Sequence, residues 1–386
     1  MLFLEKKHLR QYLITLSTDK DPSEMIKQLD ITKEYPAPEY DKITGLPDLR
    51  NGVAVRMPNH LGDAMMAMPA LMQLKEMLPQ EYALFVIAPA SQKKLYSSLK
   101  FVSGFIKLDA PHKIWSISTI KEIKRMRLGL GILFNNSFRD AVMLKFAGIP
   151  KLAGSDRRMR KLILDYAFSY PPRPEKRAAE IHQANRLLQM VYALGAPEWK
   201  GNLPNFSLPP AAEVSKTAFA ICQHPKVLTV APGAAYGAAK RWPAMYFQKV
   251  CRYWIDNGGF VVIVGTPSEQ KIATEVASGF DSKSCIDLCG KTQLDELMLI
   301  ISSSQAVVAN DSGIMHLGAA LGKPGVAVFG PTDHTATGPV SPKWKLVITE
   351  EKCGPCFKRV CPRNNPVCML NISPDEVIAA LKELAG

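Results

Sequence analysis

The sequence predicts an α/β fold made of two Rossmann-like halves, on the basis of three observations. Short apolar segments alternate with longer segments of helical periodicity from residue 51 onward, which favours a parallel sheet. A stretch rich in Gly and Pro interrupts this alternation near the middle of the chain. The chain has 386 residues, of which 47% are hydrophobic; this is long for one core, because domains usually contain roughly 50–200 residues.

The first half is expected to begin after residue 50. Each of its apolar strands runs directly into a helical segment, and a final helix closes the half. The expected strands are 53–57, 83–88 and 130–135, and the expected helices are 64–77, 91–99, 139–148 and 181–194.

The second half repeats the same alternation, which again favours a parallel sheet. A last helix closes the chain. The expected strands are 227–231, 260–265, 306–309 and 325–329, and the expected helices are 243–257, 269–278, 294–303, 314–321 and 375–384.

The breaker-rich connection at residues 195–210 is typical of a domain boundary. We therefore expect an N-terminal extension at 1–50 and Rossmann-like domains at 51–200 and 201–386. Charges that begin at Glu5 leave no room for the apolar core of a signal peptide, and no apolar run approaches the ~20 residues of a membrane span. These features predict a soluble, cytoplasmic protein.

Positive charge is concentrated in the first half. Residues 51–200 hold 23 Lys and Arg against 11 Asp and Glu, an excess of 12 in a net charge of +13, whereas residues 201–386 hold 17 against 15. The densest cluster is Arg157, Arg158, Arg160 and Lys161. It predicts an acidic partner. A solvated basic face is the alternative, and no recognisable nucleic-acid-binding motif accompanies the charge.

One apolar strand ends in Asn310-Asp311-Ser312-Gly313 and opens directly into a helix of small residues. Asp311 or Ser312 can cap this helix, and Gly313 lets another group approach its first turn. The unpaired amides of a helix start bind anions, so the segment predicts a phosphate site. An ordinary capped helix is the alternative.

Two further loops follow apolar strands. The loop at residues 232–243 is rich in Gly and Ala and contains Lys240 and Arg241, which suits the binding of a diphosphate. The loop at residues 58–63 places Asp63 outside the carboxyl end of the expected sheet, where open α/β folds bind ligands. A solvated helix start and a helix cap are the respective alternatives.

Together these segments resemble glycosyltransferase family 9, the ADP-heptose:lipopolysaccharide heptosyltransferases. The resemblance covers roughly residues 51–386 in the motif order of the family. Its blocks are Gly62-Asp63 with Pro69-Ala70-Leu71, Pro232-Gly233-Ala234 with Lys240-Arg241-Trp242-Pro243, Asp311-Ser312-Gly313 with His316, and Phe329-Gly330-Pro331-Thr332. The segment from Cys353 to Ile372 resembles the branch that includes heptosyltransferase II.

The resemblance implies a GT-B fold, with the active site in the cleft between an N-terminal acceptor domain and a C-terminal nucleotide-sugar domain, and with the last helix crossing back. It implies inverting transfer of a heptose from ADP-heptose to the inner core of lipopolysaccharide. The Kdo-lipid A acceptor would suit the basic cluster and would bring the enzyme to the cytoplasmic face of the inner membrane. Nucleic acid is not an expected partner.

The resemblance also implies roles for single residues. Asp63 would be the general base, and Lys240 with Ser312 and Gly313 would stabilise the leaving diphosphate. Asp311 would orient the donor sugar. Glu269 would contact the ribose of the donor, His316 would also contact the donor, and Thr332 would add a hydroxyl to the phosphates. The alternatives are a plain helix-start carboxylate for Glu269 and a packing role for His316.

No cofactor is expected for catalysis, because no strand end carries Asp-x-Asp and fixed cations and amides can meet the charge of the diphosphate. The spacing of Cys353, Cys356, Cys361 and Cys368 could hold a structural zinc ion or an iron–sulfur cluster. Reduced thiols in a loop are the alternative.

Other functions are weighed against this one. A transferase of another nucleotide sugar would share the same motifs. A dinucleotide-dependent oxidoreductase is disfavoured by the missing Gly-x-Gly-x-x-Gly after the first strand. A nucleic-acid-binding module is disfavoured because it would have no use for Asp63, Lys240 and Asp311 together.

Overall fold

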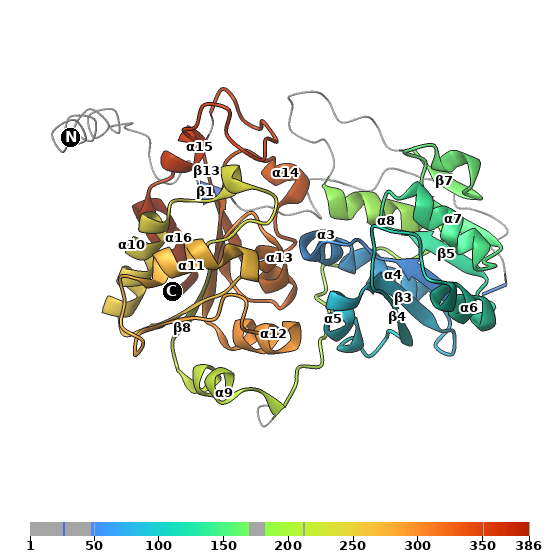
Figure 1. Cartoon of the computed structure of the whole chain (residues 1–386), viewed down its shortest axis with the longest axis horizontal. Coiled ribbons are helices and arrows are strands. Elements are labelled where there is room, and N and C mark those ends of the chain that lie inside the picture. Colours follow the sequence, from blue (N-terminus) through green and yellow to red (C-terminus); the bar gives the residue numbers. More distant parts are fainter. Residues whose placement is uncertain are drawn as a thin grey trace.

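The computed structural model describes residues 26–27, 48–49, 51–169, 182–210, 213–349 and 351–385. They form two twisted sheets that lie beside each other, each with helices on both faces (Figure 1). The prediction of an α/β fold with two Rossmann-like halves is confirmed. The expected domain limits at residues 50 and 200 stay a prediction.

The first sheet is parallel and has the strand order β4-β3-β2-β5-β6-β7. Its first strand along the chain lies next to the second and the fourth, which is the Rossmann order. The strands are β2 (Val53–Arg56), β3 (Leu84–Pro89), β4 (Gly104–Leu108), β5 (Leu130–Leu133), β6 (Lys151–Ser155) and β7 (Tyr166–Phe168). The helices are α3 (Leu61–Met66), α4 (Met68–Met77), α5 (Lys93–Ser97), α6 (Ile117–Met126), α7 (Phe138–Phe146) and α8 (Gln183–Ala193).

The second sheet repeats this order as β10-β9-β8-β11-β12-β13, and β1 (Ile26–Lys27) pairs antiparallel with β13. Its parallel strands are β8 (Val227–Ala231), β9 (Phe260–Ile263), β10 (Cys285–Asp287), β11 (Ala306–Asn310), β12 (Gly325–Phe329) and β13 (Trp344–Ile348). The helices are α9 (Lys216–Gln223), α10 (Ala244–Asp256), α11 (Gln270–Ala277), α12 (Leu294–Ser303), α13 (Gly313–Ala320), α14 (His334–Thr337), α15 (Val367–Leu370) and α16 (Pro374–Ala385).

Three expected helices differ from the structure. The helix expected at 64–77 is two helices, because the chain breaks at Ala67 ahead of Pro69, whose ring nitrogen cannot donate to the preceding turn. The helix expected at 91–99 is the shorter α5. The last helix, α16, packs on α10, β12 and β13 of its own half, so the expectation that it crosses back is wrong for the residues described.

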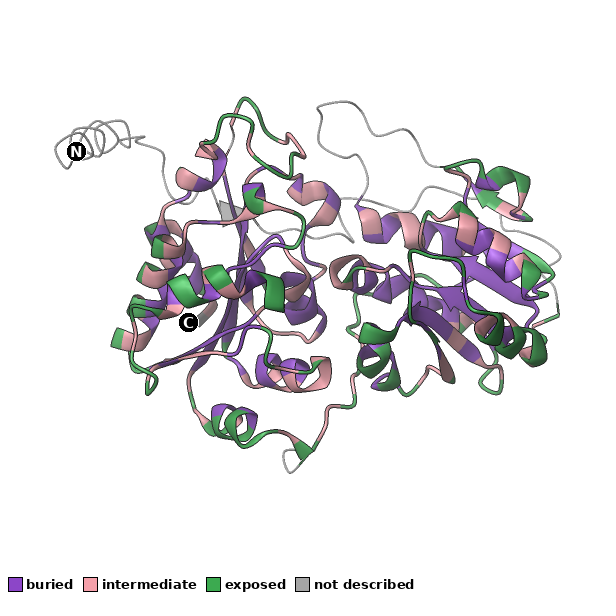
Figure 2. Ribbon diagram, in the orientation of Figure 1, coloured by how far each residue is buried: buried purple, intermediate pink, exposed green. Residues whose placement is uncertain are grey.

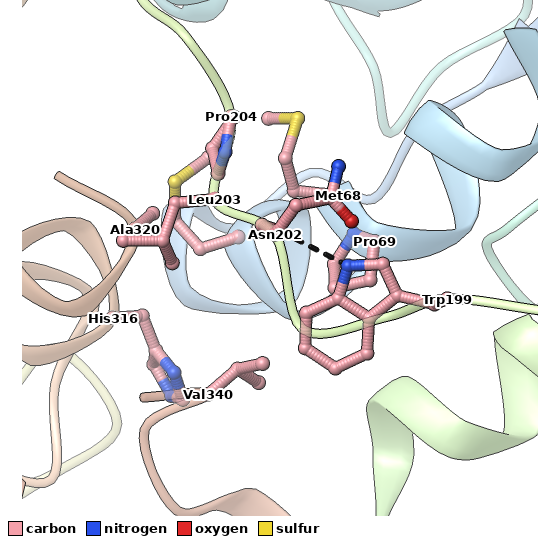
Figure 3. A pocket seen from close by; sticks show the side chains of 10 residues that line it. Met68, Pro69, Trp199, Asn202, Leu203, Pro204, His316, Ala320 and Val340 are labelled. Carbon is pink, nitrogen blue, oxygen red and sulfur yellow. Dashed lines mark hydrogen bonds between the residues drawn. The ribbon is translucent and has the colours of Figure 1, made fainter. Parts of the chain in front are cut away.

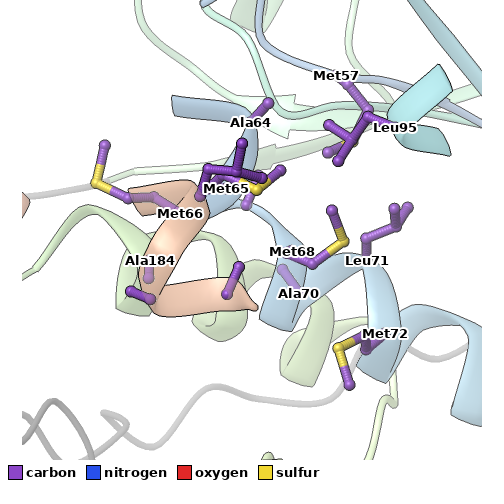
Figure 4. Close-up of a cluster of buried hydrophobic side chains, with 14 of the residues drawn as sticks. Met57, Ala64, Met65, Met66, Met68, Ala70, Leu71, Met72, Leu95 and Ala184 are labelled. Carbon is purple, nitrogen blue, oxygen red and sulfur yellow. The ribbon is translucent and has the colours of Figure 1, made fainter. Parts of the chain in front are cut away.

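The strands of both halves are buried, and the exposed residues lie mainly on outer helices and loops (Figure 2). Methionines of α3 and α4 are buried in one apolar cluster that also contains Met57 and Ala184 (Figure 4). The same apolar cluster continues into the second half through Met315 and Leu317 of α13. Flexible methionine side chains can fill the irregular space beside that helix.

The two halves touch where α3 meets α13. A Cβ atom on Gly62 would lie 3.0 Å from His316 Cδ2, and one on Gly313 would lie 3.2 Å from Leu61 Cβ. Only glycine therefore fits this approach without displacing a neighbour. On another side of the contact, an ion pair of 2.8 Å joins Lys94 of α5 to Asp295 of α12.

Candidate active site

The loops after the central strands of both sheets converge between the halves. β2 and β5 are neighbours in the first sheet, and β8 and β11 are neighbours in the second. These are the topological switch points, where open α/β folds bind ligands. Asp63 follows β2, Lys240 follows β8 and Asp311 follows β11, so three of the predicted residues lie at the two switch points.

Asp63 lies in the first turn of α3, three residues after the N-cap residue His60, and is not the cap itself. Gln183 Nε2 donates a hydrogen bond of 3.3 Å to Asp63 Oδ1. Burial raises the pKa of Asp63, although the charge of Lys240 lowers it. The carboxylate is therefore more basic than an ordinary Asp, and it lies within electrostatic range of the second half.

Lys240 and Asp311 form an ion pair in the second half. Lys240 Nζ donates to Asp311 Oδ2 at 2.5 Å, and the two side chains are 12% and 6% exposed. Thr332 Oγ1 donates to the same oxygen at 2.7 Å, and Nζ lies 4.8 Å from the centre of the Tyr236 ring. The structure thus brings three predicted donor residues together, with the charge of Lys240 balanced by Asp311.

Asn310 shapes the neighbouring loop, and the sequence analysis missed its role. Its Nδ2 donates to the carbonyl oxygens of Pro232 and Gly233, at 2.8 and 3.2 Å, and its Oδ1 accepts from the Trp242 N–H at 3.1 Å. These bonds fix both ends of the loop that carries Lys240. A polar residue at the end of an otherwise apolar strand was the available signal in the sequence, and the structure shows that Asn310 is fully buried.

Ser312 is the N-cap residue of α13, but its side chain makes no capping bond. Its hydroxyl oxygen is shielded from solvent and has no hydrogen-bond partner within the described part of the chain. Leaving a buried hydroxyl unbonded costs roughly 1–3 kcal/mol. A phosphate oxygen at this helix start would accept from the hydroxyl and from the amides of Gly313 and its neighbours.

Glu269 closes the donor side near Gly233. Its Oε2 accepts from the N–H and the hydroxyl of Thr266, at 2.7 and 2.8 Å, in a capping box that begins the short 3-10 helix Pro267–Glu269 ahead of α11. Its Oε1 lies 2.2 Å from the position of a Cβ atom on Gly233, which explains the glycine there. The helix-start role is therefore present, and the ribose contact stays a prediction.

His316 is buried against the first half. Burial lowers its pKa to about 4, so the imidazole is neutral at pH 7. It borders an apolar pocket between α3, α4 and α13, together with Trp199 and Val340 (Figure 3). This is the packing role that the sequence left open beside a donor contact.

The basic cluster divides between the surface and the interior. Arg158 and Lys161 are exposed and Arg157 is half-buried, but Arg160 is fully buried. The Arg160 guanidinium donates to Asn135 O at 2.6 Å and to Asn136 Oδ1 at 2.9 Å. This corrects the acceptor role expected for Arg160, because its side chain holds the loop after β5.

A second buried cation, Arg56, lies in the strand that precedes the Asp63 loop. Arg56, the last residue of β2, donates through Nε to Asp140 Oδ2 at 2.8 Å, and neither side chain is exposed. Asn135 Nδ2 donates to the same oxygen at 2.7 Å. This ion pair joins the end of β2 to α7, the helix that follows β5. The sequence analysis missed it, although an Arg that ends an apolar strand marks the position.

The cysteine loop runs from Cys353 to Cys368. Cys353 is exposed, Cys356 and Cys361 are half-buried and Cys368 is buried. Across the described ranges, no three His, Cys, Asp or Glu side chains are grouped as metal ligands. Burial raises the pKa of the Cys368 thiol to about 12, and the charges of Cys353, Cys356 and Cys361 add to this rise. The four thiols therefore lie close to one another.

This loop also packs on the donor loops. The Phe357 N–H donates to Pro331 O at 2.9 Å, the Tyr236 hydroxyl donates to Phe357 O at 2.8 Å, and the Ala239 N–H donates to Arg359 O at 3.0 Å. Phe357 has a φ of 54°, a costly conformation for a bulky residue. Contacts with both donor loops hold it there.

The sequence model of glycosyltransferase family 9 (heptosyltransferase) matches residues 116–366. The chain belongs to glycosyltransferase family 9. It is 28% identical to lipopolysaccharide heptosyltransferase 2 of Escherichia coli K12 over 341 residues. The aligned region covers 85% of this chain and 96% of that protein.

Solved structures of the family agree with this assignment. The structure of E. coli ADP-heptose lipopolysaccharide heptosyltransferase II has a TM-score of 0.69 and 25% identity, covering 86% of this chain and 98% of the other. A family 9 transferase from Veillonella parvula has a TM-score of 0.71 and 21% identity, covering 86% and 96%. The protein is thus a glycosyltransferase with the GT-B fold. In the part of it that the structure describes, no helix is long and apolar enough to cross a membrane.

Proposed function

We propose that this family 9 enzyme transfers a heptose, with inversion, from ADP-heptose to the inner core of lipopolysaccharide. The similarity to lipopolysaccharide heptosyltransferase 2 over most of both chains supports this donor and acceptor. One structural observation carries the mechanism: Asp63, a carboxylate of the first half whose pKa is raised, lies within electrostatic range of the Lys240–Asp311 ion pair of the second half.

In this mechanism, Asp63 takes the proton of the acceptor hydroxyl as its oxygen attacks the anomeric carbon of the heptose. The bond from that carbon to the β-phosphate oxygen breaks, and the electron pair leaves with ADP. A single attack from the opposite face inverts the anomeric centre. Burial suits Asp63 to this task, because it raises the pKa of the carboxyl group.

The leaving ADP carries growing negative charge, which the second half is arranged to receive. Lys240 supplies a compact charge, and the start of α13 supplies amides and the unbonded hydroxyl of Ser312. Asp311 binds Lys240 until the donor arrives and then orients hydroxyls of the sugar. Glu269 contacts the ribose, Thr332 contacts phosphate, and His316 stays a packing residue beside the donor.

The acceptor side is assigned to the first half. Arg157, Arg158 and Lys161 bind phosphate and carboxylate groups of the Kdo-lipid A acceptor, and Arg160 supports them from below. Because this acceptor is a membrane lipid, the enzyme would act as a peripheral protein at the cytoplasmic face of the inner membrane.

No cofactor takes part in the proposed transfer. Four thiolates can satisfy a tetrahedral ion completely, and we propose that any metal held by the cysteine loop is structural. By fixing the backbone around Phe357, such an ion would support the donor loops that this segment contacts.

The direct test incubates the purified protein with ADP-heptose and Kdo-lipid A and measures product mass and ADP release. Asp63→Asn protein is the matched control. Transfer from ADP-heptose alone supports the proposal. Transfer only from a different nucleotide sugar would replace the donor, and hydride exchange with a nicotinamide dinucleotide would replace the reaction class.

A further inference from the structure

The first turn of α8 contacts both halves of the enzyme, although the helix itself packs on α4 of the first half. Its N-cap residue, His182, is fully buried, which is unusual because helix caps commonly lie at the surface. The next residue, Gln183, is half-buried and reaches the candidate base. Neither residue belongs to the motifs of the sequence analysis.

Both ring nitrogens of His182 are used. Nδ1 accepts from the Ala184 N–H at 3.1 Å, which leaves the proton on Nε2, and Nε2 lies 3.0 Å from Gly338 O. Gly338 follows α14 in the second half. A neutral imidazole therefore caps a helix of the first half and donates across the cleft to the second.

Gln183 continues this connection to Asp63. Its Nε2 donates to Oδ1 at 3.3 Å, which leaves Oδ2 for the acceptor hydroxyl. A hydrogen bond donated to the charged form favours that form, so this bond limits the rise that burial causes in the pKa of Asp63. The other charged groups that act on Asp63 are His60, Lys240 and Asp311.

We propose that His182 and Gln183 are positioning residues that couple closure of the cleft to the orientation of Asp63. When the halves separate, the bond from His182 to Gly338 is lost and the start of α8 is free to shift. Gln183 then no longer fixes Oδ1, and the base is correctly oriented only in the closed enzyme. The inference rests on the proposed role of Asp63.

The test of Gln183 is the pH dependence of kcat. Gln183→Ala removes the donor, so the acid limb of kcat should move upward by about one pH unit, with a roughly tenfold loss below the limb. Gln183→Glu places a second carboxylate beside the first and should move the limb further in the same direction. Gln80→Ala, at an exposed position, is the control. An unmoved limb in both Gln183 variants overturns the inference.

His182 is tested by closure as well as by rate. His182→Ala should lower kcat, move the limb as Gln183→Ala does, and leave a larger radius of gyration with bound ADP. His182→Asn keeps a capping side chain but is too short to replace the ring. Full recovery in the Asn variant would mean that the effect is helix capping alone, and would refute the coupling to Gly338.

Asp63→Asn separates this inference from the proposed function. If Asp63→Asn is inactive while the Gln183 and His182 variants behave as wild type, only the positioning role is wrong. If Asp63→Asn remains active, the assignment of the base fails first.

Discussion

Replacement of Lys240 by Met tests the donor site and its stability together. Met keeps most of the length of the side chain and removes the charge. Asp311, only 6% exposed, would then keep the Thr332 hydroxyl as a hydrogen-bond donor but would lose its counter-ion. Breaking a buried pair in this way costs about 3–5 kcal/mol, and the remaining bond from Thr332 places our expectation near the lower end.

The expected result is a fall in the free energy of unfolding of about 3 kcal/mol for the second half. For a cooperative unit of that size this corresponds to roughly 6–12 °C in Tm. Lys240→Met combined with Asp311→Asn removes both charges and should recover most of the loss. The coupling energy from this double-mutant cycle should therefore reach about 2 kcal/mol.

ADP affinity measured by calorimetry is the second readout. A hydrogen bond to a charged group contributes roughly 1.5–3 kcal/mol, so Lys240→Met should weaken ADP binding by about 10- to 100-fold. The double variant should recover stability without recovering ADP affinity. Unchanged Tm and unchanged ADP affinity in the single variant would refute both the ion pair in solution and the diphosphate site at Lys240.

Four further predictions follow from the same contacts. Asp63→Asn should lower turnover by ~10² or more with ADP affinity nearly unchanged; activity within a few-fold of wild type would contradict the role of Asp63 as the base. Because folding raises the pKa of Asp63, the ionised carboxylate destabilises the folded protein at pH 7, and the Asn protein should unfold at a slightly higher temperature. The pKa of His316 falls from 6.5 to about 4 on folding. Its contribution to stability is therefore present above pH 6.5 and is lost as pH falls toward 4, with a loss of about 2 kcal/mol by pH 5. His316→Gln should flatten the fall in Tm between pH 7 and 5, and an equally steep fall in the variant would contradict the lowered pKa of His316. Replacing Arg158 and Lys161 by Gln should raise KM for the lipid acceptor and reduce its salt dependence, but not KM for the donor; equal effects on both substrates would indicate misfolding. Elemental analysis of protein purified without chelator should find at most one metal ion per chain, and if one is present Cys356→Ser should lower metal content and Tm together; metal-free, active protein with four titratable thiols would leave the loop as reduced cysteines.

The central strands could be predicted because burial on both faces requires continuous apolar residues, as in β8 and β11. Five parallel strands were not predicted from the sequence: β4, β6, β7, β10 and β13. β7 and β10 have three residues each, only one of them buried, so no apolar run marks them.

The candidate site was partly predictable for a related reason. Loops after central strands meet at the switch points, so Asp63, Lys240 and Asp311 could be placed from sequence. Gln183 could not, because it reaches Asp63 from a helix 120 positions later. Charge counting also failed for Arg160, because it does not distinguish an exposed guanidinium from one buried on a loop.

Because α3 and α13 meet at Gly62 and Gly313, the two halves can approach each other closely only while these positions have no side chain. Alanine at position 62 or 313 would act as a wedge, with its new carbon only 3.0 or 3.2 Å from the facing side chain. The added carbon would lie one residue from Asp63 or from Ser312, so His316 or Leu61 would have to give way by a few tenths of an ångström without any change in a group that performs chemistry. Such a chain would still bind each substrate on its own half, and a fall in turnover with unchanged substrate binding would measure how closely the two halves must approach for transfer.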